Sequence, residues 1–149
     1  MKELKIEKAT IDKVGDLLML FGKYQDFYGA SVIKNSNEEF LKDVLSGSEK
    51  GIFHVAYFDN QPVGFSGVYF SYSSVLAKKI AIINDLFILT DFRKQGFGRL
   101  LIDETINFLK EGKVVNIRWC TKSDNLDAQN LYNNLDVGKS DWIHYDLKI

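Results

Sequence analysis

The chain has 149 residues and a hydrophobic fraction of 46%, which fits one globular domain over residues 1–149 better than two domains or a disordered chain. A formal net charge of -1 argues against a general nucleic-acid binder, and a single cysteine rules out an internal disulfide and a cysteine-rich zinc site. A charged N-terminus and the lack of a long apolar run predict neither signal peptide nor membrane span, so we expect a cytoplasmic protein without a membrane partner or a bound metal.

The first half of the chain predicts two helices between strands. Residues 4–10 alternate apolar and polar side chains, as a strand does, and Thr10 is a candidate cap for a helix over residues 11–28. Ser36 and Glu39 are spaced as a capping box for a helix over residues 37–45. Residues 51–58 and 63–70 then predict two strands of a hairpin.

The second half predicts alternating strands and helices. Residues 78–90 are nearly all apolar, which favours a buried central strand, and the helix that follows should end near Gly112. A strand over residues 114–120, a short helix over 125–135 and an alternating strand over 142–149 complete the chain. We therefore expect an α/β fold with a mixed, mostly antiparallel sheet of about six strands, one parallel pair and about four helices.

A glycine-containing junction, "RKQGFGRLL", separates the central strand from the next helix. A helix N-terminus presents unpaired N–H groups and partial positive charge, and glycine lets an anion approach them. Arg93, Lys94 and Arg99 would add mobile positive charge, so the junction is a candidate diphosphate site. A plain tight turn made by Gly96 and Gly98 explains the spacing equally well. Neither the P-loop nor the dinucleotide fingerprint matches.

The pattern Arg-x-x-Gly-x-Gly after an apolar strand, together with "NLDAQNLY" downstream, resembles the two acyl-CoA-binding motifs of the GNAT superfamily of N-acetyltransferases. The resemblance covers nearly the whole chain. The stretches "KYQDFYG", "GVYFSYSSV" and "INDLFIL" resemble the branch of diamine, polyamine and D-amino-acid acetyltransferases. The family resemblance implies a GNAT-like fold with a splayed parallel strand pair. It also implies acetyl-CoA as cofactor, CoA as product, and a homodimer.

The activity implied by this resemblance is transfer of an acetyl group to a primary amine of a polyamine, diamine or amino acid, by direct attack in a ternary complex. A protein acetyltransferase acting on lysine or an N-terminus is an alternative. A CoA-binding regulatory domain without turnover is another. It is favoured by Asn84, where some relatives place a carboxylate, and by Asp136-Val137, where the family commonly has Gly-Phe.

The resemblance also implies where the cofactor would be held. Main-chain groups of Phe87 and Ile88 would bind the pantetheine arm, and Asn125 would reach the arm or the thioester end. The diphosphate would lie on the amides of the glycine junction, which comprises Arg93, Lys94, Gln95, Gly96, Phe97, Gly98 and Arg99.

Acetyl transfer needs a proton acceptor, because a primary amine with a pKa of about 10.4 is mostly protonated at neutral pH. The leaving thiol, with a pKa of about 8.5, needs only modest help, for which Tyr132 is the candidate acid. Asp85 is a candidate proton acceptor or amine anchor and equally a structural group, since a carboxylate on an apolar strand needs partners. The resemblance also makes Asn84 a candidate catalytic residue, at a position where some relatives place a carboxylate.

An acidic residue among aromatic rings would suit the ammonium group of the acceptor. Such a cluster follows the first predicted helix, and one more tyrosine lies on the predicted hairpin. Each member could equally be a packing residue. The candidates are Tyr24, Asp26, Phe27, Tyr28 and Tyr69.

Overall fold

A five-stranded sheet in the order β1-β2-β3-β4-β5 forms the centre of the molecule. The computed structural model describes residues 3–31 and 35–149. The strands are β1 (Leu4–Lys8), β2 (Gly51–Phe58), β3 (Gln61–Ser73), β4 (Lys78–Ile88) and β5 (Ile117–Arg118). The helices are α1 (Val14–Tyr28), α2 (Ser36–Leu45), α3 (Phe97–Glu111) and α4 (Leu126–Asn133), with 3₁₀ turns η1 (Ile11–Lys13) and η2 (Thr90–Phe92).

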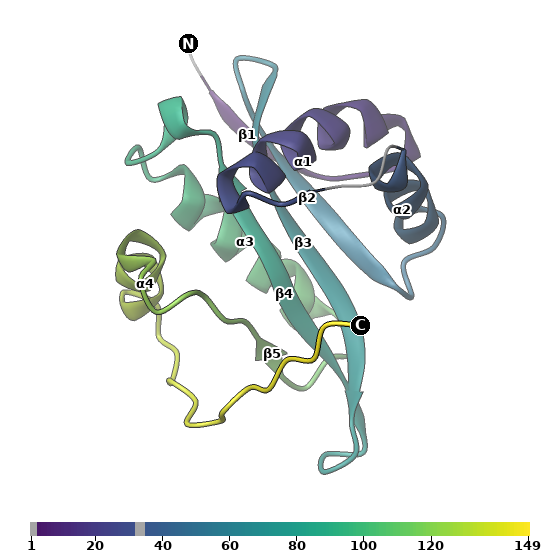
Figure 1. Cartoon of the computed structure of the whole chain (residues 1–149), viewed down its shortest axis with the longest axis vertical. Coiled ribbons are helices and arrows are strands. Elements are labelled where there is room, and N and C mark those ends of the chain that lie inside the picture. Colours follow the sequence, from purple (N-terminus) through teal and green to yellow (C-terminus); the bar gives the residue numbers. More distant parts are fainter. Residues whose placement is uncertain (1–2, 32–34) are drawn as a thin grey trace.

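Helices cover both faces of the sheet (Figure 1). On one face, α1 and α2 pack on aromatic residues of β2, β3 and β4, where Phe53 and Phe65 are fully buried. On the other face, Ile102 and Leu109 of α3 pack on aliphatic residues of the same strands. This division follows from the alternation of side chains along each strand, which sends neighbouring residues to opposite faces.

The connectivity confirms the predicted mixed α/β fold. β1 to β4 pair antiparallel, whereas β4 and β5 pair parallel through the crossover helix α3. Within residues 3–31 and 35–149, no helix is long and apolar enough to cross a membrane.

Several local predictions were wrong. Residues 142–149 form no strand and are exposed, so the described sheet has five strands and not six. The strand expected over residues 114–120 shortens to Ile117–Arg118. The cap of α2 is Asn35, with Ser36 already inside the helix, and the Thr10 hydroxyl bonds Asp12 and caps no main-chain N–H. Alternation predicts which face a strand shows, but a strand forms only where an edge pairs with it.

β4 and β5 separate after a short stretch of pairing. Only Ala81 with Ile117 and Ile82 with Arg118 are partners. On its other side, β4 pairs with β3 through a bulge, because Gly67 lies opposite Asp85 while Val68 lies opposite Ile83. Asn84 is therefore the extra residue of the bulge, which bends and twists the strand at this point. The β4 edge that faces β5 is consequently unpaired beyond the bulge.

A buried polar cluster joins β2, β3 and α3 beneath the sheet. His54 is 2% exposed, and its Nδ1 lies 3.4 Å from Thr105 Oγ1, which in turn lies 2.7 Å from Ser66 Oγ. Burial and, to a lesser degree, the charge of Lys8 lower the pKa of His54 from 6.5 to about 4. The imidazole is thus neutral in the folded protein.

We expect this histidine to make the fold acid-sensitive. Above pH 6.5 both states hold a neutral imidazole; as the pH falls from 6.5 to about 4, only the unfolded state gains the proton, so stability is lost in that window. The loss should approach about 3 kcal/mol. Urea unfolding of wild type and His54→Gln at several pH values measures it. The stability difference between the two should shrink on acidification; a constant difference would exclude His54 as the cause.

Candidate active site

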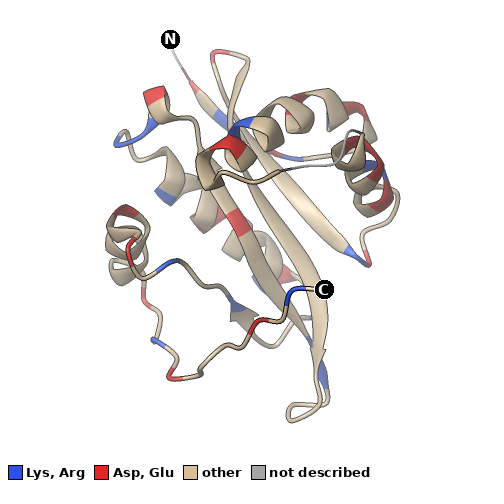
Figure 2. Ribbon diagram, viewed as in Figure 1, with Lys and Arg blue, Asp and Glu red and all other residues tan. Residues whose placement is uncertain are grey.

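The separation of β4 and β5 opens a small cavity of about 40 Å³. Beside it lies a wider cleft of about 410 Å³ between the end of α1 and the segment that leads into α4. The two share Tyr28 and Asn125. Figure 2 shows acidic stretches of ribbon on β4, near the end of α1 and on α4. The cavity is lined by Tyr24, Tyr28, Ile83, Asn84, Leu86, Cys120, Thr121, Asn125, Ala128 and Tyr132.

The register of β4 decides which main-chain groups face this gap. Leu89 N–H donates to Val63 O over 2.8 Å, which makes these two residues a hydrogen-bonded pair. Hydrogen-bonded pairs recur every second residue of an antiparallel ladder, so Phe65 and Phe87 form the next such pair. Phe87 therefore points its N–H and C=O toward β3. Leu86 and Ile88 point theirs away from β3, into the gap. The main chain of Phe87, predicted to face the gap, therefore faces β3, whereas that of Leu86 faces the gap.

The glycine junction has the backbone of an anion site. Gly96 caps α3 with φ +82, a conformation that favours glycine, and Leu100 N–H makes a hydrogen bond to its carbonyl at 3.1 Å. The N–H groups of Phe97, Gly98 and Arg99 precede that bond and lack partners within the helix. A Cβ on Gly98 would meet Leu131 only at 3.7 Å, an ordinary contact. Gly96 is thus the glycine that the backbone itself requires.

The two arginines of the junction are tethered, contrary to the expected mobile charge. The Arg93 guanidinium lies 4.8 Å from the ring centre of Phe27, and its Nε donates to Ile88 O over 2.8 Å. Arg99 Nε donates to Asp103 over 2.7 Å. Arg93 therefore links the end of α1 to β4, and the Ile88 carbonyl already accepts a hydrogen bond from it. The Ile88 N–H faces the gap on the side of β4 away from β3.

Asp85 is the centre of a hydrogen-bond network. Its side chain accepts from Tyr24 Oη at 2.9 Å, Asn84 Nδ2 at 3.0 Å and Tyr69 Oη at 3.3 Å. A Cβ at Gly67 would collide with its Oδ2, so glycine at that position makes room for the carboxylate. Burial raises the pKa of Asp85, and the three hydrogen bonds only partly oppose that rise. The carboxylate is thus a better proton acceptor than an exposed one.

The network reaches the cavity through Tyr24 and Asn84. Asp85 is 6% exposed and does not line the cavity, whereas Tyr24 and Asn84 do. Burial, followed by the charge of Asp85, raises the pKa of both Tyr24 and Tyr69 above the ordinary value, so both are phenols at neutral pH. Tyr24 therefore stands between the gap and the buried carboxylate.

Tyr132 faces the same cavity from α4. Its ring packs edge-on against Trp119 at 5.8 Å. Burial, followed by the charges of Tyr28 and Cys120, raises the pKa of Tyr132 to about 12, so the phenol keeps its proton. Asn125 caps α4 by accepting Ala128 N–H at 3.2 Å, which leaves its amide NH₂ to serve as a donor.

The remaining residues predicted for the acceptor site lie in three different parts of the structure. Tyr28 lines both hollows, and Phe27, which is 52% exposed, lines the wider cleft. Asp26 is exposed and lines neither hollow. Tyr69 lines neither as well; its hydroxyl donates to Asp85 and its ring packs against Phe53. Sequence reasoning missed Leu86, because the bulge that sets its direction leaves no mark in the composition of the strand. It also missed Cys120 and Thr121, which line the cavity after β5.

The match to known proteins fits this geometry. Residues 17–136 match the model of the Acetyltransferase (GNAT) family, and the chain belongs to that family of N-acetyltransferases. An uncharacterised N-acetyltransferase of Bacillus subtilis, YhfO, is 27% identical over 98% of both chains. The thialysine N-epsilon-acetyltransferase of Caenorhabditis elegans is 25% identical, over 91% of this chain and 84% of its own.

Solved structures share the fold. A probable acetyltransferase superposes with a TM-score of 0.86 at 29% identity, over 97% of both chains. An aminoglycoside acetyltransferase solved with CoA superposes with a TM-score of 0.84 at 13% identity, over 99% of this chain and 96% of its own. The family assignment makes this chain an acetyltransferase that acts on amines.

Proposed function

We propose that the chain transfers an acetyl group from acetyl-CoA to a primary amine of a small molecule, of the polyamine, diamine or amino-acid class, by direct attack in a ternary complex. One observation carries the proposal: Tyr132 and the Tyr24–Asp85 pair open into the same gap as the unpaired edge of β4. The name of the Caenorhabditis elegans relative, an acetyltransferase of an amino-acid side-chain amine, supports this acceptor class.

The residues present suit acetyl-CoA. The Leu86 main chain and the Ile88 N–H are free on the side of β4 that faces the gap, as an extended amide-containing arm requires. The unpaired amides of Phe97, Gly98 and Arg99 would bind the diphosphate at the N-terminus of α3. The Asn125 NH₂ would donate to the arm. The bound cofactor supplies an activated acetyl thioester.

The Tyr24–Asp85 pair would take the proton of the amine. The Tyr24 oxygen would accept the proton that the amine loses, while its own proton would pass to Asp85 Oδ1, 2.9 Å away. The raised pKa of Asp85 favours this transfer. Tyr132, which keeps its proton at neutral pH, would donate it to the leaving thiolate. The Tyr69 and Asn84 hydrogen bonds keep the carboxylate in place.

An amine panel tests the proposed activity. Free thiol should appear when the protein is mixed with acetyl-CoA and a diamine, a polyamine or a basic amino acid. In a parallel titration, acetyl-CoA should bind with measurable heat. Binding without thiol release on any amine would favour the CoA-binding regulatory domain. Thiol release with peptides alone would favour a protein acetyltransferase. Mass spectrometry of cell extracts incubated with labelled acetyl-CoA would then identify the acetylated proteins.

A further inference from the structure

The wider cleft beside the gap carries charged groups of both signs. It is lined by Lys122 and Asp124, on the segment between β5 and α4, and by Asp127, in the first turn of α4. The rings of Phe27 and Tyr28, at the end of α1, also line it. In Figure 2, blue and red stretches lie along the ribbon between β5 and α4. The charged residues take no part in the proton transfers proposed above, so they are available for a different contact with the substrates.

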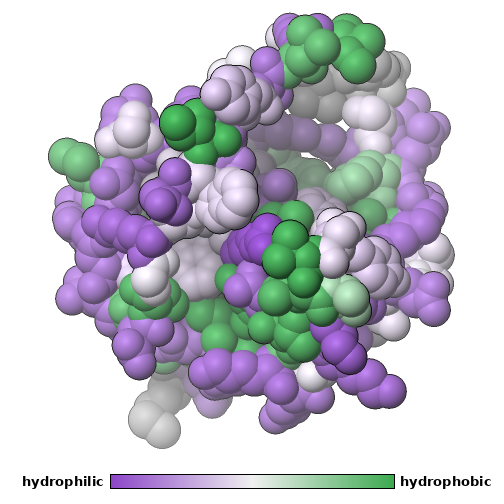
Figure 3. Space-filling model, turned by 90° about the horizontal axis from the view of Figure 1, so that it is seen from below, coloured by the Kyte–Doolittle hydropathy of each residue, from purple (hydrophilic) through white to green (hydrophobic). Residues whose placement is uncertain are grey.

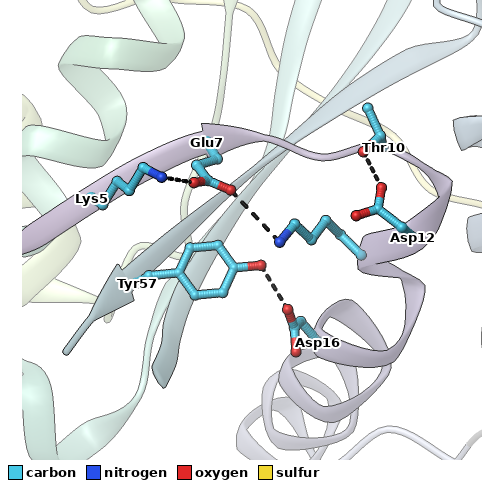
Figure 4. A network of polar contacts seen from close by, with 7 residues as sticks. Lys5, Glu7, Thr10, Asp12, Asp16 and Tyr57 are labelled. Atoms are coloured by element: carbon cyan, nitrogen blue, oxygen red, sulfur yellow. Dashed lines mark hydrogen bonds and ion pairs between the residues drawn. The ribbon is translucent and has the colours of Figure 1, made fainter. Parts of the chain in front are cut away.

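The charges of the cleft are not paired with one another. Charged side chains are common at a protein surface, and hydrophilic residues cover much of the face seen in Figure 3. Near β1 such charges do pair, since Lys5 and Glu7 form an ion pair and the Lys13 ammonium lies 3.7 Å from Glu7 (Figure 4). Among the described residues, no ion pair involves a charged residue of the cleft. These groups can therefore bind a ligand that carries both signs of charge.

Lys122 lies where the cleft meets the gap. Its ammonium is 5.1 Å from the centre of the Tyr28 ring, and the attraction between a cation and an aromatic face holds it there. Tyr28 lines both the cleft and the small cavity that contains Tyr24, so a ligand bound at Lys122 can reach the gap past this ring. Phe27 and Tyr28, exposed by 52% and 39%, offer apolar surface to a methylene chain on the way.

We propose that the acceptor is a free amino acid with an amine at the end of its side chain, such as lysine or ornithine, bound in the cleft by its zwitterionic end. The α-carboxylate would bind Lys122, and the α-ammonium would bind Asp124 and Asp127. The side chain would extend past Tyr28 and bring its amine to Tyr24. A diamine or polyamine has no carboxylate and would bring only like charge to Lys122, which disfavours it. This inference rests on the proposed function and selects one of its acceptor classes.

Two compounds matched to lysine test the proposal, because each lacks one of its charges. Cadaverine lacks the carboxylate, and Nα-acetyllysine lacks the α-ammonium. With acetyl-CoA at saturation, kcat/KM measured by thiol release should be at least about ten-fold higher for lysine than for either compound, the value of one hydrogen bond to a charged group. Cadaverine or Nα-acetyllysine used as well as lysine would overturn the inference and leave the proposed function in place. No thiol release with any amine would overturn both.

A pair of lysine variants locates the carboxylate contact. Lys122→Met removes the ammonium and keeps most of the length of the side chain. It should lower kcat/KM for lysine about ten-fold, through KM, while that for cadaverine changes less than about two-fold. Lys110→Met is the matched control, because Lys110 is also exposed, lies in the last turn of α3 and lines neither hollow. It should leave the turnover of both amines unchanged. An equal loss for lysine and cadaverine in Lys122→Met, or no loss for either, would overturn the assignment of Lys122.

Discussion

Replacement of Asp85 by asparagine should lower kcat at least about 100-fold, the range of general acid–base catalysis. Asparagine keeps the size of the side chain and the Tyr24 hydrogen bond, but it cannot accept the proton that Tyr24 passes on. In the wild type, kcat should fall as the pH drops through the raised pKa of Asp85. This acid limb should be missing from the pH profile of Asp85→Asn, measured by thiol release at saturating substrates.

Tyr69→Phe is the matched control, because it removes a donor to Asp85 and keeps the carboxylate. That hydrogen bond lowers the pKa of Asp85, so its loss should move the acid limb to higher pH while kcat above the limb changes only a few-fold. A rise in the KM of the amine alone for Asp85→Asn would identify Asp85 as an anchor of the acceptor. An unchanged kcat, KM and pH profile would leave it a structural group.

Tyr132→Phe should slow kcat about 100-fold, near the low end for a general acid, because a thiolate leaves readily. The substitution keeps the ring and its packing against Trp119, so the gap should retain its shape. The affinity for acetyl-CoA, measured by calorimetry, should therefore change less than about two-fold.

Acetyl donors with better leaving thiols distinguish an acid from a packing residue. A donor whose thiol has a lower pKa needs less proton donation, so it should restore part of the lost rate in Tyr132→Phe while changing the wild type little. Equal turnover of Tyr132→Phe and wild type would remove Tyr132 from the acid role.

The parts of the fold that depend on local pattern could be predicted from the sequence. The apolar run that became β4, the glycine junction and the capped helix α4 each carry their own signal, since Gly96 needs a positive φ and Asn125 is a favoured cap. The prediction that Tyr24 and Tyr132 belong to one site came from the family resemblance. No local sequence pattern links them, because 108 positions of the chain separate them, although both line the same cavity.

Other features depend on pairing, which composition does not encode. The bulge at Asn84 shifts the alternation of β4, so a parity count from the start of the strand gives the wrong direction for Leu86 and Phe87. The arginines at positions 93 and 99 suggested mobile charge, but their partners Ile88 O and Asp103 are visible only in three dimensions. The strand-like pattern of residues 142–149 likewise does not provide a partner, and in the structure these residues join no strand.

A crystal structure of the chain with acetyl-CoA bound would show whether the gap between β4 and β5 receives the cofactor. We expect a pantetheine arm along the main chain of Leu86 and Ile88, with the diphosphate on the amides of Phe97, Gly98 and Arg99. Acetyl-CoA bound elsewhere, or a gap filled by side chains while the cofactor lies on the surface, would contradict it.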